Sequence, residues 1–294
     1  MEYSCHGTTK PKILILGSVD QNTGKLRLKP RWFEAFNGLD VDLVPIDPTK
    51  IKRAELLDLL HSANGILLAG GDINVHPSYY GDDDPINQHY VWGQNPPKNC
   101  YARDRTDIAL YMTNYAIEHK IPILGICLGA QEMNVAMGGK LLQTLGRRHV
   151  TPFADTDNLW DAQHHGMDVS MTIGGGKIGM MRQIFGRSGM MGCNSVHDQG
   201  IPVSGLAPPL QIEAIADDGE VVEVASLPGH PFFLVAQTHF EGLQNLPENK
   251  KVFEALVKAA QQHRQREVLE QSMLQRLITP SYGLTLEKMV MAAE

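Results

Sequence analysis

The sequence predicts an α/β fold in which a mostly parallel central sheet lies between two layers of helices. Short apolar runs typical of buried strands alternate with segments of helical spacing, which indicates right-handed βαβ units. One of these runs turns through a cysteine, flanked by glycines, directly into a helical segment. The chain has 294 residues, 43% of them hydrophobic, which is enough for one large core.

The first half of the chain supplies three predicted strands and two predicted helices. The strands are expected at residues 12–17, 41–46 and 65–69, and the helices at residues 31–36 and 52–61. The third strand leads into Gly70-Gly71, and ligands bind beyond the carboxyl ends of strands in such sheets. Two glycines let backbone N–H groups approach a substrate oxygen, so Gly70 and Gly71 are candidates for an oxyanion hole. An ordinary glycine turn is the alternative.

The middle of the chain carries the segment around which the prediction is built. Residues 103–119 have helical spacing and lead into the apolar run 121–126. Cys127 follows between Gly125 and Gly129, and a helix is expected over residues 130–137. A strand that turns sharply into a helix, with a nucleophile at the bend, is a nucleophile elbow. There the helix dipole favours the thiolate. A buried structural cysteine beside two packing glycines is the alternative.

Periodicity is weaker beyond residue 139. Residues 141–161 resemble an inserted loop, and residues 164–173 end in a strand-like alternation. The later elements are clearer: a hairpin at residues 211–216 and 220–225, a strand at 232–236 and an amphipathic helix at 250–262. The last strand and last helix are predicted to complete the sheet and its cover.

His239 and Glu241 come just after the last predicted strand. On an extended segment, residues two positions apart project to the same side. Glu241 is therefore expected to bind one imidazole nitrogen while the other nitrogen faces Cys127. A thiol nucleophile needs such a base and such an orienting carboxylate. The predicted catalytic residues are Cys127, His239 and Glu241.

Gly125-Ile-Cys-Leu-Gly-Ala-Gln131 resembles the nucleophile motif of class I glutamine amidotransferases. The run from Gln131 to Gly139 is most similar to the γ-glutamyl-γ-aminobutyrate hydrolase (peptidase C26) branch of that superfamily. The resemblance covers roughly residues 12–262. It implies a flavodoxin-like three-layer sandwich, a triad in the chain order Cys, His, Glu, and hydrolysis of γ-glutamyl amides through a glutamyl thioester.

The resemblance also implies further site residues. The Leu128 N–H joins the oxyanion hole, and Gln131 is a candidate contact for the glutamyl group of the substrate. Tyr80 lies in a segment that resembles an active-site loop, and His197 is expected to line the pocket rather than to act as the base. The family usually has Gln-Trp-His-Pro-Glu around the histidine, whereas this chain has Thr238 and Phe240. We expect the backbone path and the substrate preference to be affected.

Composition excludes several classes of protein. A net charge of −7 argues against nucleic acid as an obligate partner. We expect neither a membrane span nor a secretory signal, because no apolar run reaches 18 residues and the N-terminus lacks a basic and an apolar region. Four cysteines in so long a chain form no disulfide framework, which suits the reducing cytoplasm. No metal or cofactor is expected, and His164-His165 is interpreted as a solvated loop.

Residues 10–262 are predicted to form the hydrolase domain, and residues 263–294 a C-terminal helical extension. The extension is expected to pack on the domain, to form a homodimer contact or to bind a protein partner. Two other functions stay open. The chain could be a glutaminase subunit that supplies ammonia to a separate synthetase, or a non-catalytic binding module on the same fold. The intact Cys127, His239 and Glu241 favour the hydrolase.

Overall fold

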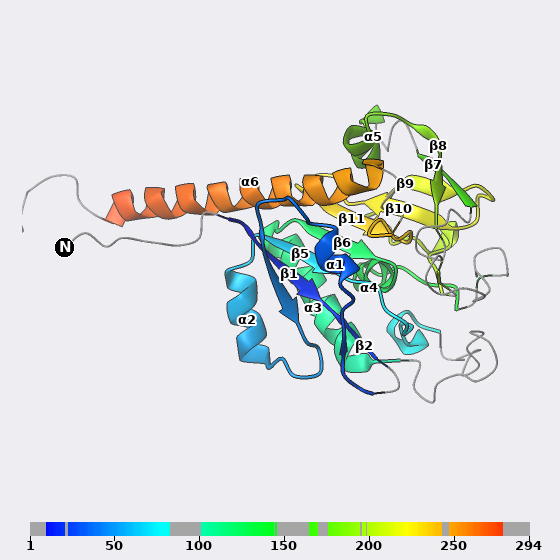
Figure 1. Cartoon of the computed structure of the whole chain (residues 1–294), viewed down its shortest axis with the longest axis horizontal. Coiled ribbons are helices and arrows are strands. Elements are labelled where there is room, and N and C mark those ends of the chain that lie inside the picture. Colours follow the sequence, from blue (N-terminus) through cyan, green and yellow to red (C-terminus); the bar gives the residue numbers. More distant parts are fainter. Residues whose placement is uncertain are drawn as a thin grey trace, which may run out of the picture.

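A computed structural model describes residues 10–20, 23–82, 101–143, 145, 165–169, 176–194, 196–197, 199–242 and 247–278. Within these residues the main sheet has nine strands in the order β4-β1-β5-β6-β11-β10-β9-β7-β8. A second sheet pairs β2 (Ser18–Val19) with β3 (Leu26–Arg27). Figure 1 shows the strands running through the body of the molecule, with helices on either side.

The first five strands of the main sheet are parallel, which confirms the predicted parallel centre. They are β4 (Asp42–Ile46), β1 (Lys12–Leu16), β5 (Gly65–Leu68), β6 (Ile123–Ile126) and β11 (Phe233–Ala236). The other four pair antiparallel: β10 (Val222–Ser226), β9 (Gln211–Ala216), β7 (His165–Val169) and β8 (Gly189–Cys193). The predicted hairpin is the β9–β10 pair.

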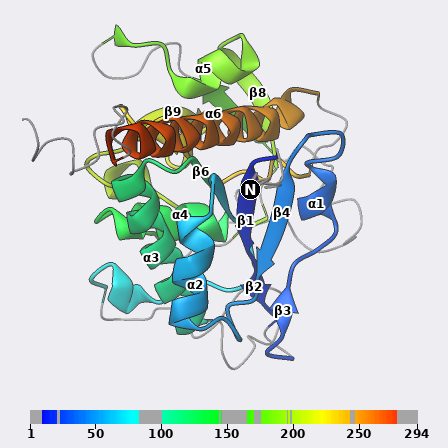
Figure 2. The same cartoon turned by 90° about the vertical axis from the view of Figure 1, so that its left-hand side faces the viewer.

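Helices cover both faces of the sheet, so the predicted three layers are present (Figure 2). One face carries α2 (Arg53–His61), α3 (Arg103–His119) and α4 (Leu128–Ala136). The other carries α1 (Arg31–Glu34), α5 (Met180–Phe185) and α6 (Pro247–Ile278). Short 3₁₀ turns span Pro77–Tyr79 and Val203–Gly205.

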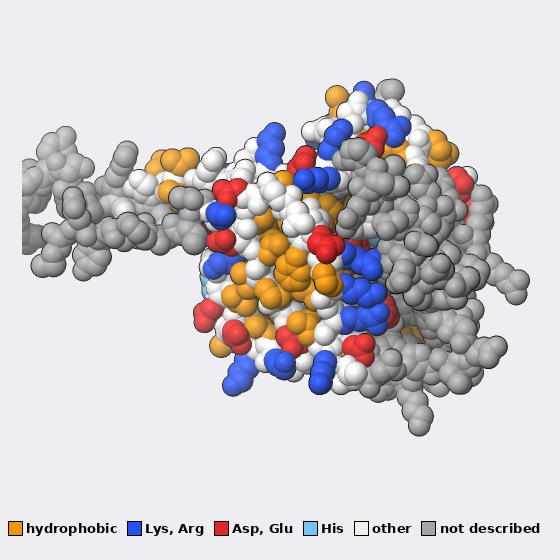
Figure 3. All heavy atoms as spheres, viewed as in Figure 1, with side chains coloured by type: hydrophobic (Ala, Val, Ile, Leu, Met, Phe, Trp, Pro, Cys, Tyr) orange, Lys and Arg blue, Asp and Glu red, His pale blue; other side chains and the backbone are white. Residues whose placement is uncertain are grey.

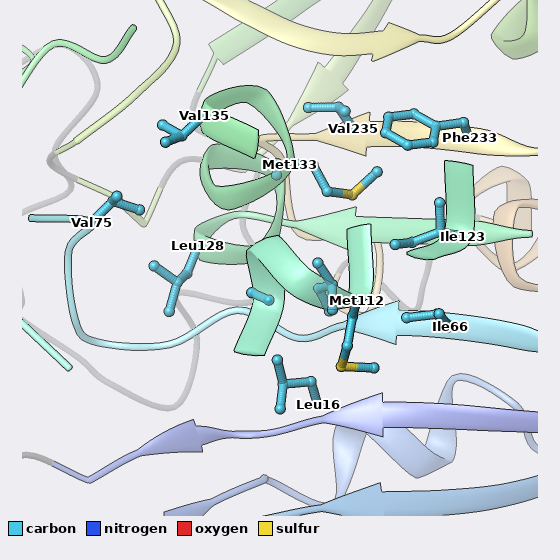
Figure 4. Close-up of a cluster of buried hydrophobic side chains, with 14 of the residues drawn as sticks. Leu16, Ile66, Val75, Met112, Ile123, Leu128, Met133, Val135, Phe233 and Val235 are labelled. Atoms are coloured by element: carbon cyan, nitrogen blue, oxygen red, sulfur yellow. The ribbon is translucent and has the colours of Figure 1, made fainter. Parts of the chain in front are cut away.

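Side chains along each strand point alternately to the two faces of the sheet, so the core consists of two clusters, one on each face. Along β1, Leu14 and Leu16 belong to the cluster under α2, α3 and α4, whereas Ile13 and Ile15 belong to the cluster under α1 and α6. Figure 4 shows part of the first cluster, with Met133 of α4 near the strands and Leu128 beyond their arrow tips. These apolar layers fix the sheet edge at which β5, β6 and β11 end.

Helix α6 is longer than predicted. It runs without interruption across the expected domain boundary between residues 262 and 263, and its distal part extends beyond the body (Figure 1). Glu267 Oε2 still accepts a hydrogen bond from Asn64 Nδ2 at 2.9 Å, so the helix contacts the domain past that boundary. Farther along, four apolar side chains are more than half exposed: Val268, Leu269, Met273 and Leu274. Figure 3 shows hydrophobic atoms on the part of the molecule that extends beyond the body. The predicted dimer or partner contact stays a prediction.

Candidate active site

Three neighbouring parallel strands end at the same edge of the sheet, and each is followed by predicted site residues. β6 is followed by Cys127, β5 leads to Gly70 and Gly71, and β11 leads to His239. The Cys127 N–H donates to the Ala236 carbonyl at 2.8 Å, which joins the ends of β6 and β11. The carboxyl edge of a parallel sheet is the usual place for a site in such folds.

Cys127 occupies a strained turn between β6 and α4. Its backbone angles are φ 52° and ψ −106°, a region that L-residues rarely adopt. Glycines make the turn possible: a Cβ on Gly125 would lie 2.7 Å from the Gly129 carbonyl oxygen, and one on Gly129 would lie 2.2 Å from the Leu68 carbonyl oxygen. The predicted elbow is therefore present, although α4 begins at Leu128 rather than at residue 130.

His239 and Glu241 form a buried pair, with His239 Nδ1 2.5 Å from Glu241 Oε1. The expectation of an extended segment is wrong, because β11 ends at Ala236 and the Gly242 N–H closes a turn onto the His239 carbonyl at 3.2 Å. The turn, not a strand, brings the carboxylate back to the ring.

The electrostatics of the site act on His239. Burial opposes its positive charge, but the neighbouring Glu241 and Cys127 outweigh burial and raise the pKa of His239 above its usual range. The imidazole is therefore held between a carboxylate and a sulfur, as a base that is easily protonated.

Gly70 lies directly against both reactive side chains. A Cβ there would be 2.8 Å from His239 Cε1 and 3.3 Å from the Cys127 Cβ. A Cβ on Gly71 would lie 3.2 Å from Leu128 Cδ2. Leu128 is the first residue of α4, so its N–H has no acceptor within the helix. The structure thus brings Gly70, Gly71 and Leu128 together beside the thiol.

A buried ion pair supports the Gly70 loop, and sequence analysis missed it. Arg105 Nη1 contacts Glu132 Oε2, and Arg105 Nη2 donates to the Ala69 carbonyl at 2.8 Å. Burial raises the pKa of Glu132 to about 7, although Arg105 opposes this shift. Arg105 on α3 and Glu132 on α4 therefore fix the residue that precedes Gly70.

The three predicted substrate residues lie in one buried hydrogen-bond network. Gln131 Nε2 donates to the Gln199 carbonyl at 2.6 Å, and His197 Nδ1 lies 3.1 Å from the same oxygen. Tyr80 accepts from Gln199 Nε2 at 3.3 Å. Gln199 also binds both main-chain groups of Val75, at 2.8 and 3.0 Å. Sequence analysis missed Gln199, although it lies within the segment that suggested His197.

The two departures from the family pattern are buried in the protein. The Thr238 hydroxyl lies 3.2 Å from Asn194 Oδ1. Phe240 packs edge-on against Phe185 of α5, with ring centroids 6.2 Å apart. The His239–Glu241 contact is present next to both residues.

The described residues contain no cluster of three or more His, Cys, Asp or Glu side chains suited to a metal ion. His164 lies outside the described residues, but His165 is the first residue of β7, so the interpretation of His164-His165 as a loop is wrong for His165. In the same described part of the chain, no helix is both long and apolar enough to cross a membrane.

Comparison with known proteins adds family information to this geometry. The family model for peptidase C26 matches residues 22–241. A Schizosaccharomyces pombe protein, provisionally named a glutamine amidotransferase, is 34% identical over 203 residues, 68% of this chain and 71% of that protein. The γ-glutamyl-γ-aminobutyrate hydrolase of Escherichia coli K12 is 31% identical over 219 residues, 74% of this chain and 80% of that protein.

A solved structure shares the fold. It is a Thermoplasma acidophilum protein, provisionally named as part of a GMP synthase, with a TM-score of 0.58 and 15% identity. The match covers 88% of this chain and 98% of that one. At this identity the similarity shows the fold alone.

Proposed function

This chain belongs to the peptidase C26 family, and from that membership we propose that it hydrolyses γ-glutamyl amide bonds with Cys127 as nucleophile, His239 as base and Glu241 as the orienting carboxylate. The observation that carries the proposal is the 2.5 Å contact between His239 and Glu241, made by a ring that also interacts with Cys127. A relative 31% identical to this chain is named a γ-glutamyl-γ-aminobutyrate hydrolase, which supports the substrate class.

In the first half of the reaction, the Cys127 sulfur attacks the γ-carbonyl carbon of the substrate. His239 takes the thiol proton and, as an imidazolium held by Glu241, gives it to the nitrogen of the departing amine. The C–N bond breaks and a glutamyl thioester remains on Cys127. The backbone N–H groups of Leu128 and of the Gly70-Gly71 turn stabilise the oxyanion that forms during the attack.

In the second half, water attacks the thioester. His239 takes a proton from this water and returns it to the sulfur as the C–S bond breaks, which releases glutamate and restores the thiol. Gln131, His197 and Tyr80 form the buried polar wall proposed to hold the glutamyl group. A thiol nucleophile works only while it is reduced, so we place the activity in the cytoplasm.

The test compares wild type with Cys127→Ala and Cys193→Ala. Cys193 is a second buried free cysteine, and burial, reinforced by Glu223, raises the pKa of its thiol. Because this thiol also interacts with Thr238, the control is read by whether glutamate and the adduct form, not by the rate. Each protein is incubated with γ-glutamyl-aminobutyrate, other γ-glutamyl amides and glutamine. Glutamate release and the intact mass are then measured.

We expect wild type and Cys193→Ala to release glutamate and to show a transient adduct of one glutamyl group, and Cys127→Ala to do neither. Release from glutamine alone would instead favour the glutaminase subunit. No turnover of any amide, combined with a thiol that reacts slowly with haloacetamides, would reject the hydrolase in favour of a binding module.

A further inference from the structure

The Asn194 side chain binds the main chain of the proposed base. Its Oδ1 accepts a hydrogen bond from the His239 N–H at 2.8 Å, and its Nδ2 donates to the His239 carbonyl at 3.2 Å. The Thr238 hydroxyl lies 3.2 Å from the same Oδ1 and 3.4 Å from the Asn194 carbonyl oxygen, and its single proton is donated to one of these two oxygens. All three residues are buried, so solvent cannot replace these bonds.

We propose that Asn194 and Thr238 act as positioning residues that hold the His239 imidazole against Cys127. We call the two residues the Asn194 clamp. The inference rests on the proposed function, because the catalytic pair of that function is what the clamp aligns. The hydrogen bonds of the clamp lead to the main chain that carries His239, so we place the action of both residues through His239.

The clamp binds the chain just after its last hydrogen bond to the sheet. β11 ends at Ala236, and the Gln237 N–H still donates to the Glu223 carbonyl of β10 at 2.8 Å. Two residues later, the His239 N–H donates to Asn194 instead. The His239 carbonyl accepts from both Asn194 Nδ2 and the Gly242 N–H. The clamp therefore sets where the turn that carries His239 and Glu241 begins.

The ring has little freedom to compensate for a shift of its backbone. Glu241 binds Nδ1 on one side, and on another side Gly70 approaches so closely that a Cβ would lie 2.8 Å from Cε1. Trp32 of α1 also borders the ring, with centroids 6.4 Å apart. A displacement of the His239 main chain is consequently passed on to the contact between imidazole and sulfur.

Thr238 supplies the third hydrogen bond of the clamp. It stands where the family usually has tryptophan, and a threonine hydroxyl can donate to the Asn194 amide oxygen within a buried site. This third bond joins the Thr238 side chain to Asn194. Because valine has nearly the shape of threonine, the bond can be removed with little change in packing.

The experiment measures alkylation of Cys127 by iodoacetamide as a function of pH, located by peptide mass spectrometry, together with kcat and KM for γ-glutamyl-aminobutyrate. Four proteins are compared: wild type, Thr238→Val, Thr238→Ser and Asn194→Asp. Serine restores the hydroxyl. Aspartate keeps the oxygen that faces the His239 N–H but places a second oxygen, in place of the amide NH2, against the His239 carbonyl.

We expect Thr238→Val to slow both alkylation at neutral pH and kcat by about three- to tenfold, the effect of one lost neutral hydrogen bond. KM should stay within about twofold, because the bond does not touch the substrate. Thr238→Ser should recover most of the loss. Asn194→Asp should lose about a hundredfold, as expected when a catalytic group moves by about 1 Å. Labelling of each variant should recover at alkaline pH, where ordinary thiols ionise.

Unchanged alkylation and kcat in Thr238→Val would overturn the proposal, as would equal losses in Thr238→Val and Thr238→Ser. A lower Tm with an unchanged pH profile would show that the clamp supports only the fold. Alkylation needs no substrate, so it separates the two proposals. If wild type hydrolyses no amide yet labels rapidly, the proposed function fails while the clamp is still tested.

Discussion

A methyl group at Gly70 should disable the proposed site without unfolding the protein. In Gly70→Ala the new Cβ would lie 2.8 Å from His239 Cε1 and 3.3 Å from the Cys127 Cβ. Ordinary contact begins at 3.4 Å, so the imidazole and the new methyl must separate by about 0.6 Å. Moving a catalytic group by about 1 Å costs about a hundredfold in rate. We therefore expect kcat to fall between about tenfold and a hundredfold.

Gly65 provides a matched control in the same part of the chain. It is the first residue of β5, at the opposite end of the strand, and its Cβ would lie 3.1 Å from Ile13 Cγ1 and 3.3 Å from the Ala260 Cβ. Crowding of this kind costs about 1–3 kcal/mol of stability in a packed core. Gly65→Ala should therefore lower Tm, while its folded fraction keeps the wild-type kcat.

The assay measures glutamate release, alkylation of Cys127 and thermal unfolding for both variants. Gly70→Ala should lose activity out of proportion to its loss of stability, and Gly65→Ala should show the reverse. If Gly70→Ala kept the wild-type kcat and alkylation rate, the close approach of residue 70 to the thiol and the imidazole would be refuted, and with it the oxyanion role of this turn.

Three further changes test other parts of the structure. Glu241→Gln removes the carboxylate that raises the pKa of His239, so kcat should fall by about a hundredfold or more and the alkaline limit of the pH–rate profile should move to lower pH. Because the pKa of His239 is raised in the folded state, the contribution of this group to stability is complete below the unfolded pKa and is lost as pH rises through the folded pKa. In urea unfolding, the difference in free energy of unfolding between wild type and Glu241→Gln should therefore shrink at alkaline pH. Arg105→Met leaves the Glu132 carboxyl buried without its partner, so the free energy of unfolding should fall by about 3–5 kcal/mol; an unchanged urea midpoint would contradict the buried pair. Removal of residues 268–294 should preserve Tm and activity. Removal of residues 263–294, at the proposed domain boundary, should lower Tm because it deletes the Glu267 bond to Asn64. Equal Tm values for the two truncations would contradict that contact.

The parallel half of the fold could be predicted because its strands carry a strong local signal. The runs that form β1, β5 and β6 are apolar on both faces, and each is followed by glycine or by the glycine-flanked cysteine. In the antiparallel half the β9–β10 hairpin was predicted, but the outer strand lacks that signal. β8 has the sequence Gly-Met-Met-Gly-Cys, in which glycine and methionine give no clear period, and neither β8 nor α5 was predicted. We also predicted a boundary within α6, between residues 262 and 263, because the family resemblance ends there. No glycine or proline interrupts the helix at that point.

The reactive side chains could be predicted for a similar reason. Cys127, His239 and Glu241 each follow a strand or lie two positions from a partner, and local spacing reveals such residues. Arg105, Asn194 and Gln199 were missed because they bind main-chain groups 36, 45 and 124 positions away. Only the tertiary fold brings such residues to their partners, so a local stretch of sequence cannot reveal these contacts.

The backbone angles of Cys127 bear on why this position holds a cysteine at all. A non-glycine residue at φ 52° and ψ −106° costs roughly 1–3 kcal/mol, which glycine would not incur. Cys127→Gly should therefore yield an inactive protein that unfolds at a higher temperature than Cys127→Ala, despite having lost a further buried methyl. A protein that only binds its ligand would be more stable with glycine at position 127. Stability and chemistry thus make opposite demands on residue 127, and a thermostability screen that ignores turnover would select against the proposed nucleophile.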